Sequence, residues 1–242
     1  KGRMEEPENI FKVLDRHFAH GCDLAGRRVL ITAGPTREKI DPVRYIGNFS
    51  SGKMGFALAA ESAARGAEVT LVAGPVSLPT PQGCIERIDV TSAQQMHDAV
   101  LSRFHDADAA IMCAAVADYC VEHVAETKIK RERDAVPVIR LKKNPDIAKA
   151  VGEIKRPGQV TVGFALETDH EEQNAKSKLD RKHLDFIVLN SLRDKDAGFQ
   201  TDTNKIKIIQ RDGRVRDYEC KSKSLVARDI VDVLVKDYLG DK

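Results

Sequence analysis

Between residues 26 and 189, short apolar runs alternate with longer stretches in which apolar residues recur at helical spacing. The short runs are typical of strands buried on both faces, and the longer stretches are typical of amphipathic helices. The repeated strand–helix–strand pattern favours parallel pairing through right-handed crossovers. We therefore expect an α/β fold, a Rossmann-like three-layer domain with a mostly parallel sheet. The strands are expected at about 28–33, 66–74, 85–90, 107–115, 136–141, 160–165 and 186–189, and the helices at about 53–65, 92–104, 145–155 and 169–183.

The pattern changes toward the C-terminus. Two strand-like runs, 204–210 and 214–218, flank an Asp-Gly pair, which predicts a β-hairpin. Residues 222–239 then read as an amphipathic helix that closes the chain. We divide the chain into a junction segment at 1–25, with a short helix to about His20, and one domain at 26–242.

Composition narrows the function classes. Hydrophobic residues make up 42% of the 242 residues, which suffices for a sizeable core. Lys and Arg total 39 against 37 Asp and Glu, so a formal charge of +2 gives no case for a nucleic-acid or membrane partner. No apolar stretch has the length of a membrane span, and the N-terminus carries no signal-peptide core. The five scattered cysteines form no CxxC pair, which indicates reduced thiols and a cytoplasmic protein, and the histidines show no metal-binding spacing.

The segment 26–57 carries the first candidate site. An apolar strand ends in a turn, a polar loop follows, and residues 50–52 open a helical stretch. A helix N-terminus placed there suits an anion, because its first amides are unpaired and its dipole favours negative charge. The loop nearly matches a P-loop, but Met54 replaces the Ser or Thr that holds magnesium, so we reject that motif. With Arg44 and Asn48 just upstream, anion binding is favoured over an ordinary capped helix start.

A second candidate site lies at 113–119, where small residues end an expected strand. Small side chains let a flat base approach the backbone, and Asp118 could accept hydrogen bonds from ribose hydroxyls; a tightly packed strand end is the competing interpretation. Basic residues cluster at 128–131, at 142–143 and along 178–182. Each cluster alone is typical of a solvated surface, but three beside strand ends suit a polyphosphate. A dinucleotide site is disfavoured, since the glycine fingerprint and the acidic residue after the second strand are missing.

Five segments, taken together and in order, resemble one enzyme family. They read ITAGPTREKIDPVRYIGNFSSGKMGFALA, AAVADY, KIK, KNPDI and GFALET. In this set the chain is similar to phosphopantothenate–cysteine ligases, the C-terminal half of bacterial bifunctional coenzyme A biosynthesis proteins, over nearly all of residues 26–240. The opening GRMEEPENI resembles the junction after the flavin-dependent decarboxylase half, so FMN is expected only on that half.

The resemblance implies a CTP-dependent ligase with Mg²⁺ as its divalent cation. In that family the carboxylate of 4′-phosphopantothenate attacks the α-phosphate of CTP, which gives an acyl-cytidylate and pyrophosphate. The amine of L-cysteine then displaces CMP and forms 4′-phospho-N-pantothenoylcysteine. A homodimer is the expected assembly, with an upstream decarboxylase domain in the full-length protein.

The resemblance also implies roles for particular residues. Asn48 and Arg44 lie on the loop that handles the acyl-cytidylate, and Lys128 contacts the triphosphate. Asp118 holds the ribose, and Phe164 packs by the base or sugar. The remaining nucleotide-binding residues implied are Met112, Cys113, Ala114, Pro145, Asp146, Ile147, Ala148, Lys178 and Lys182. No metal ligand is assigned.

Two other functions stay open at this point. A Rossmann-like nicotinamide oxidoreductase would need the fingerprint that is missing here. A non-catalytic nucleotide-binding module would hold CTP without consuming it. Composition does not separate these from the ligase, whereas the ordered motifs favour the ligase.

Overall fold

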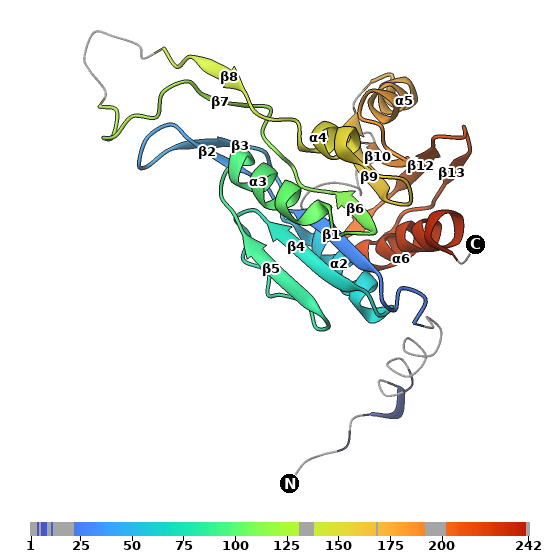
Figure 1. The fold of residues 1–242 in the computed structure, drawn as a ribbon. Coiled ribbons are helices and arrows are strands. Elements are labelled where there is room, and N and C mark those ends of the chain that lie inside the picture. Colours follow the sequence, from blue (N-terminus) through green and yellow to red (C-terminus); the bar gives the residue numbers. More distant parts are fainter. Residues whose placement is uncertain are drawn as a thin grey trace.

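The computed structural model describes residues 4, 6–8, 11, 22–130, 138–167, 169–191 and 202–240. Its centre is an eight-stranded sheet in the order β13-β12-β10-β9-β6-β1-β4-β5 (Figure 1). The six strands from β5 to β10 in this order pair in parallel, and β12 and β13 join one edge antiparallel. This confirms the mostly parallel α/β fold and the C-terminal hairpin. The strands are β1 Arg28–Ala33, β4 Glu68–Ala73, β5 Ile85–Asp89, β6 Ala109–Met112, β9 Val160–Glu167, β10 Phe186–Ser191, β12 Ile206–Gln210 and β13 Val215–Asp217.

Helices cover both faces of the sheet, which is why its central strands are apolar on both sides. Along β1, Leu30 packs with α3 and α4, while Ile31 on the opposite face packs with α2 and α6. The helix α5 packs on the same face as α3 and α4, against β9 and β10. Three layers result, as expected. The helices are α2 Lys53–Ala64, α3 Ala93–Phe104, α4 Ile147–Ile154, α5 Glu171–Arg181 and α6 Lys223–Leu234, and α6 continues as a π-helical turn at Val235–Leu239.

Helix boundaries follow local capping. The side chain of Ser92 accepts a hydrogen bond from the amide of Gln95, whose own side chain accepts from the Ser92 amide, so α3 begins with a full capping box. For α4, Pro145 was expected at the first helical position. Instead Asp146 is the N-cap, and its side chain accepts from the Lys149 amide, so Pro145 precedes the helix.

Two short antiparallel ribbons form an arm that projects from the sheet (Figure 1). We call residues 37–47, 119–130 and 138–143 the arm. The first ribbon lies where a polar loop was expected, and the expected strand at 136–141 is wrong, since residues 138–140 are irregular and β8 starts at Leu141. Residues 107–115 are likewise a shorter strand than expected, because the chain leaves the sheet at Cys113. The arm strands are β2 Arg37–Lys39, β3 Tyr45–Gly47, β7 Tyr119–Val121 and β8 Leu141–Lys143.

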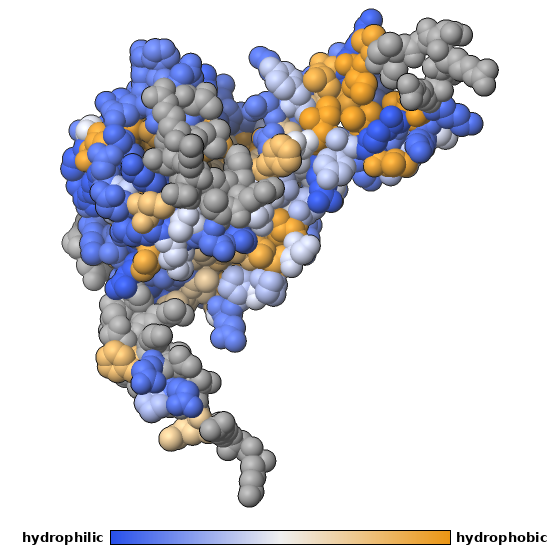
Figure 2. All heavy atoms as spheres, turned by 180° about the vertical axis from the view of Figure 1, so that it is seen from behind, coloured by the Kyte–Doolittle hydropathy of each residue, from blue (hydrophilic) through white to orange (hydrophobic). Residues whose placement is uncertain are grey.

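The arm differs from the rest of the molecule in its surface. Figure 2 shows apolar side chains gathered on the arm, away from the rounded body. Val138 is 87% exposed, and Tyr45 is 52% exposed. Groups of exposed apolar side chains on one face usually mark a surface that another molecule covers. The other large apolar arm residues that stand exposed are Val43, Tyr119, Val124, Ile139 and Leu141.

The folded body reaches slightly beyond the expected boundary at residue 26, because Leu24 is fully buried in the core. The division into a junction segment and a domain otherwise stays a prediction, and the helix expected up to His20 lies mostly outside the described residues. Among the helices that the structure describes, none combines the length and apolarity needed to cross a bilayer.

Candidate functional site

A cavity of about 780 Å³ opens at the carboxyl ends of β1, β6 and β9. Ligands of open α/β sheets collect at this edge, because successive loops diverge there and leave a crevice. Side chains from both faces of the sheet reach it. Its lining includes Thr32, Gly34, Asn48–Gly55, Met112–Tyr119, Lys143–Ala148, Gly163–Leu166, Lys178, Lys182, Leu184, Ile187, Asn190, Asn204 and Lys223.

The N-terminus of α2 forms one wall of the cavity. Its N-cap, Gly52, has a φ of 76°, a left-handed conformation that glycine adopts without strain, and no side chain caps the helix. One turn in, Gly55 lies so close to β1 that an added Cβ would fall 2.5 Å from the Cβ of Ala33. The two glycines therefore allow the start of α2 to pack closely against the end of β1. The first amides of α2 are left facing the cavity, as the anion-site hypothesis requires.

Asn48 enters the cavity from the loop that precedes α2. Its side-chain amide donates a hydrogen bond of 2.9 Å to the carbonyl oxygen of Val116. This bond ties the loop after β3 to the loop after β6 and fixes the direction of the Asn48 carboxamide. Its carbonyl oxygen stays available to a ligand that enters between the two loops.

The loop after β6 is shaped by hydrogen bonds to its backbone. The hydroxyl of Thr32 accepts from the Ala114 amide at 3.1 Å, and the side chain of Asn144 donates to the Ala117 carbonyl at 2.8 Å. The amide of Asn144 also donates to the Asp118 carbonyl at 2.9 Å. The carboxylate of Asp118 stays exposed at the cavity rim. A flat ring could therefore lie along residues 112–114 with a hydrogen-bonding group beyond it at Asp118.

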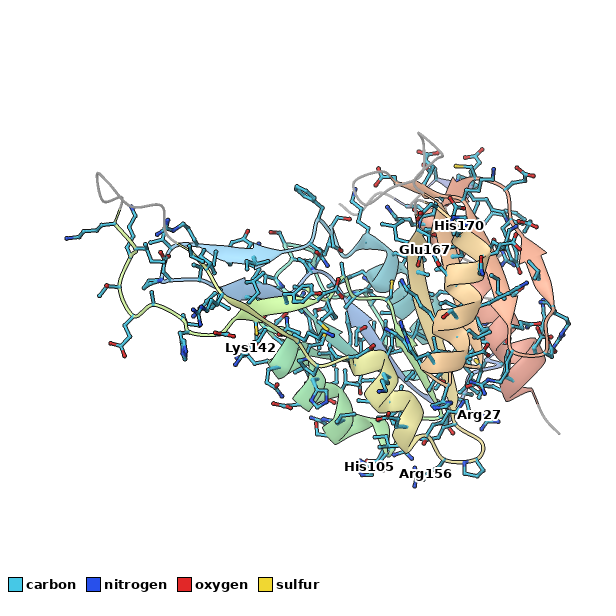
Figure 3. All side chains as sticks on the ribbon, turned by 90° about the horizontal axis from the view of Figure 1, so that it is seen from above. Arg27, His105, Lys142, Arg156, Glu167 and His170 are labelled. Atoms are coloured by element: carbon cyan, nitrogen blue, oxygen red, sulfur yellow. The ribbon has the colours of Figure 1, made fainter. Side chains whose placement is uncertain are left out.

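Two lysines at the C-terminal end of α5 bring positive charge to this wall, Lys178 in its last turn and Lys182 as its C-cap, and each is held by a carboxylate. Lys178 lies 2.7 Å from Glu167, and Lys182 lies 2.9 Å from Asp146, the N-cap of α4. Figure 3 shows Glu167 at the carboxyl end of the sheet, while Arg27 and Arg156 lie at the opposite end. An incoming phosphate would compete with carboxylates that are already in place, so the lysine positions are set before a ligand arrives.

Cys113 lies in the middle of the cavity wall. Burial raises the pKa of its thiol to about 12, so the thiol is protonated at neutral pH. This argues against a nucleophilic role, because the thiolate is the reactive form. The ring of Phe164 is partly buried against the core and also lines the cavity.

Twelve of the fourteen residues expected at the site line this one cavity, and two do not. Arg44 and Lys128 lie on the arm and are absent from the lining. The twelve that line it are Asn48, Met112, Cys113, Ala114, Asp118, Pro145, Asp146, Ile147, Ala148, Phe164, Lys178 and Lys182.

Arg44 serves a different centre in this structure. Its guanidinium forms an ion pair of 2.5 Å with the buried carboxylate of Asp41 and donates to the Ile129 carbonyl at 2.8 Å. Asp41 also accepts hydrogen bonds from the amides of Val43 and Ile129. The bond from Arg44 is the main reason why the pKa of Asp41 lies well below its ordinary value of 3.8. Because Ile129 bonds to both Asp41 and Arg44, the neighbouring residue Lys128, which is exposed, lies beside the β2–β3 ribbon.

Polar residues in the cavity that sequence reasoning missed include Asn190, Asn204 and Lys223. Lys223 is the first residue of α6 and is only 7% exposed. Ser222 is a recognisable helix cap, but nothing in the sequence says that α6 packs beside α2 and so starts at the cavity.

Metal ligands are sparse in the part of the chain that the structure describes. It contains no group of three or more His, Cys, Asp or Glu side chains able to hold an ion together. Asp118 and Asp146 are separate carboxylates on the cavity wall. Two separate carboxylates fit Mg²⁺ only if substrate phosphates and water supply most of the ligands of the ion.

The fold and this site define a Rossmann-like α/β protein with a lysine-lined cavity at the carboxyl edge of its sheet. A profile of the family described as "DNA/pantothenate metabolism flavoprotein C-terminal domain" matches residues 24–238. The chain therefore belongs to this family. Among solved structures, the C-terminal domain of the coenzyme A biosynthesis bifunctional protein CoaBC is 40% identical with a TM-score of 0.78, covering 91% of this chain and 100% of that one.

Full-length relatives are longer than this chain. It is 49% identical over 238 residues to the coenzyme A biosynthesis bifunctional protein CoaBC of Haemophilus influenzae, covering 98% of this chain and 58% of that protein. It is also 50% identical over 235 residues to a protein named cysteine/cysteine sulfinic acid decarboxylase from an unknown prokaryotic organism, covering 96% of this chain and 65% of that protein. The chain thus spans about three fifths of either relative, and the names of both describe the longer proteins.

Proposed function

We propose that this chain is a phosphopantothenate–cysteine ligase that uses CTP in coenzyme A biosynthesis. One observation carries the proposal. Twelve residues that the family resemblance assigns to the site, spread from Asn48 to Lys182, line a single cavity. Membership of the family and the shared fold with the CoaBC C-terminal domain support the same conclusion.

In the first half-reaction, a carboxylate oxygen of 4′-phosphopantothenate attacks the α-phosphorus of CTP. The bond from that phosphorus to the bridging oxygen breaks, and pyrophosphate leaves with the electron pair. Lys178 and Lys182, held by Glu167 and Asp146, would balance negative charge on the nucleotide phosphates. Mg²⁺, when bound with CTP, would neutralise further charge on the phosphates.

In the second half-reaction, the amine of L-cysteine attacks the carbonyl carbon of the acyl-cytidylate. The acyl–oxygen bond breaks, CMP leaves, and the ammonium proton is released to solvent or to CMP. Asn48 would orient the reacting carbonyl, because its carboxamide is already fixed by the bond to Val116. The cytosine would lie along Met112, Cys113 and Ala114, with its ribose at Asp118.

The proposed assembly is a homodimer formed through the arm. The arm exposes Val138, Tyr45 and other apolar side chains that its own chain leaves uncovered in the described structure. A dimer would also give Lys128 a place in the mechanism, because the arm of one copy could bring Lys128 to the nucleotide in the cavity of the other. Arg44 would reach the other copy together with Lys128, since both residues belong to the arm.

The setting in the cell is part of the proposal. An upstream decarboxylase domain that carries FMN is proposed for the full-length protein, in line with the length of the CoaBC relatives. The cytoplasm is the proposed compartment, which the free state of all five cysteines supports.

The experiment that tests the function measures pyrophosphate release from CTP in magnesium buffer. We expect release only when 4′-phosphopantothenate is present, and CMP together with the cysteine amide only after L-cysteine is added. Release with ATP in place of CTP would correct the nucleotide. Measurable CTP binding by a folded chain without any release would instead favour a binding module.

The dimer has its own test. The double variant Val138→Asp, Leu141→Asp places charges on the apolar arm and should give monomers by light scattering at micromolar concentration. Ile154→Asp is the matched control, because Ile154 is 50% exposed but lies on α4, outside the arm. A dimer that survives the double variant would assign the contact to another surface.

A further inference from the structure

The cavity has two sources of positive charge, on opposite faces of the sheet. Lys178 and Lys182 enter from α5, on the face that α3 and α4 share. Lys53 and Lys223 enter from the first residues of α2 and α6, on the other face. The two pairs therefore approach the cavity from opposite sides of the strand ends.

Lys223 is largely buried, a position in which a lysine side chain is rarely found. It is only 7% exposed and lines the cavity. Burial lowers its pKa and the nearby charge of Lys53 lowers it further, whereas the Asp202 carboxylate raises it. Lys53 and Lys223 both line this end of the cavity, where Lys53 pairs with Asp202, so an incoming phosphate would meet two ammonium groups and replace that carboxylate.

The backbone at this end also suits an anion. The start of α2 is uncapped by side chains, and Gly52 leaves its amides open to close approach. Ser50 turns its hydroxyl to the Gly52 amide at 3.3 Å, so the loop wraps the helix start. A phosphate here would meet backbone amides from one side and two lysines from the other.

We propose that Lys223, together with Lys53 and the start of α2, binds the 4′-phosphate of phosphopantothenate and selects the phosphorylated acid over free pantothenate. This inference rests on the proposed function. With its phosphate at this end, the substrate would extend past Asn48 and Cys113. Its carboxylate would then lie toward the nucleotide wall, where the first half-reaction takes place. Lys223 thereby becomes a residue that determines specificity, in a position that the sequence motifs do not mark.

Calorimetric titration of the full chain without CTP tests the assignment. For Lys223→Met and Lys53→Met we expect the affinity for 4′-phosphopantothenate to fall about 10- to 100-fold, the usual effect of losing a charge-assisted hydrogen bond. The weak affinity for pantothenate and the affinity for CTP should stay unchanged. Lys236→Met is the matched control, because Lys236 is 67% exposed on the continuation of α6 and pairs with Asp232.

Asp202 offers a test of opposite sign. Its carboxylate lies 2.5 Å from the Lys53 ammonium and is 84% exposed, so it competes with an incoming phosphate. Asp202→Asn should tighten phosphopantothenate binding by up to about fivefold, the range that an exposed ion pair allows. A gain here and a loss in the lysine variants could not both come from misfolding.

The titrations separate this inference from the proposed function. Unchanged phosphopantothenate affinity in both lysine variants, or a loss of CTP affinity instead, would overturn the assignment. Absence of phosphopantothenate binding to the unmodified chain would overturn it as well. If the unmodified chain binds phosphopantothenate through these lysines yet releases no pyrophosphate, the subsite stands and the ligase activity does not.

Discussion

The cavity and the arm hold their polar residues in place by different means. Around the cavity, Asn48, Asp118 and the α5 lysines stand on loops and helices that the buried parallel sheet fixes. On the arm, Arg44 and Lys128 depend on two short ribbons and on one buried carboxylate, Asp41. The cavity is therefore built within one chain, whereas the arm exposes apolar surface and holds its charged residues outside the cavity.

This difference indicates a division of labour. A rigid edge can bind and orient substrates, because its residues keep their positions whether or not a ligand is present. A projecting arm can deliver a charge only after it meets a second surface. The proposed mechanism places substrate positioning in the first region and part of the charge stabilisation in the second.

The sharpest test of the division is Lys128→Gln. If the arm supplies charge to the transferring phosphoryl group, pyrophosphate release should fall at least about 100-fold, in line with the loss of one preorganised donor. The fold should be unchanged, because Lys128 is exposed. Near-normal pyrophosphate release would remove Lys128 from the mechanism.

A mixing experiment sharpens the same point. Lys128→Gln and Asn48→Asp chains, each impaired alone, should regain ligase activity when they are mixed and allowed to exchange subunits. One cavity of the mixed dimer would then combine an intact Asn48 with an intact arm from the other chain. No recovery in verified mixed dimers would mean that Lys128 acts within its own chain.

Asn48→Asp probes the rigid edge and should have the next largest effect. A carboxylate cannot donate to the Val116 carbonyl, so the group that orients the acyl-cytidylate loses its anchor. We expect the acyl-cytidylate to accumulate and its conversion by L-cysteine to slow roughly tenfold or more. Rapid-quench separation of the two half-reactions measures both effects. Unchanged product formation would contradict the role of Asn48.

Asp41→Asn should loosen the arm and leave the sheet intact. The carboxylate accepts bonds from Arg44 and from the Ile129 amide, and an amide side chain retains only one acceptor oxygen. Limited proteolysis within residues 122–130 should become faster, while the melting temperature of the core changes little. An unchanged cleavage rate would show that the ribbons hold the arm without Asp41.

The same centre predicts a pH dependence. The pKa of Asp41 is lowered in the folded chain, chiefly by the hydrogen bond from Arg44, so its contribution to stability is complete above the ordinary value of 3.8. That contribution is lost as the pH falls from 3.8 through the lower folded pKa. Arm cleavage in the unmodified chain should therefore increase only below about pH 4, and the Asp41→Asn variant should lack this transition.

The smallest effect is expected far from both regions. Ser92→Ala removes half of the capping box of α3 and should cost about 1 kcal/mol of unfolding free energy. That corresponds to a fall of roughly 2–4 °C in melting temperature for a chain of this size. Ligase activity at 25 °C should stay unchanged. A loss of activity here would mean that α3 influences the cavity.

The sequence predicted the sheet well, because buried parallel strands leave continuous apolar runs such as 29–31. It also predicted where α3 and α4 begin, because Ser92 and Asp146 are strong capping signals. It predicted the arm poorly. Strands such as β2 and β8 are three residues long and depend on cross-strand partners, so their own residues carry little periodic signal.

The site residues were likewise predictable where the information is local and not where it depends on long-range packing. Residues within family motifs, such as Asn48 and Asp118, could be assigned to a shared site from those motifs alone. Lys223 could not, because its position depends on how α6 packs beside α2, a contact between segments about 170 residues apart that no local pattern encodes. The end of the strand at Met112 was also misjudged, since apolar residues continue past the last hydrogen-bonded pair.

The two ends of the folded body lie close together in space. The guanidinium of Arg27, just before β1, donates to the carbonyl of Leu239 at 3.1 Å, at the edge of the sheet opposite the cavity. A short peptide could therefore join Gly240 to Cys22, and new termini could open in the tight turn at Gly213. Such a circular permutant should keep its substrate cavity. For the same reason, a chain tethered to a sensor surface beside Arg27 would present the cavity mouth to the solution.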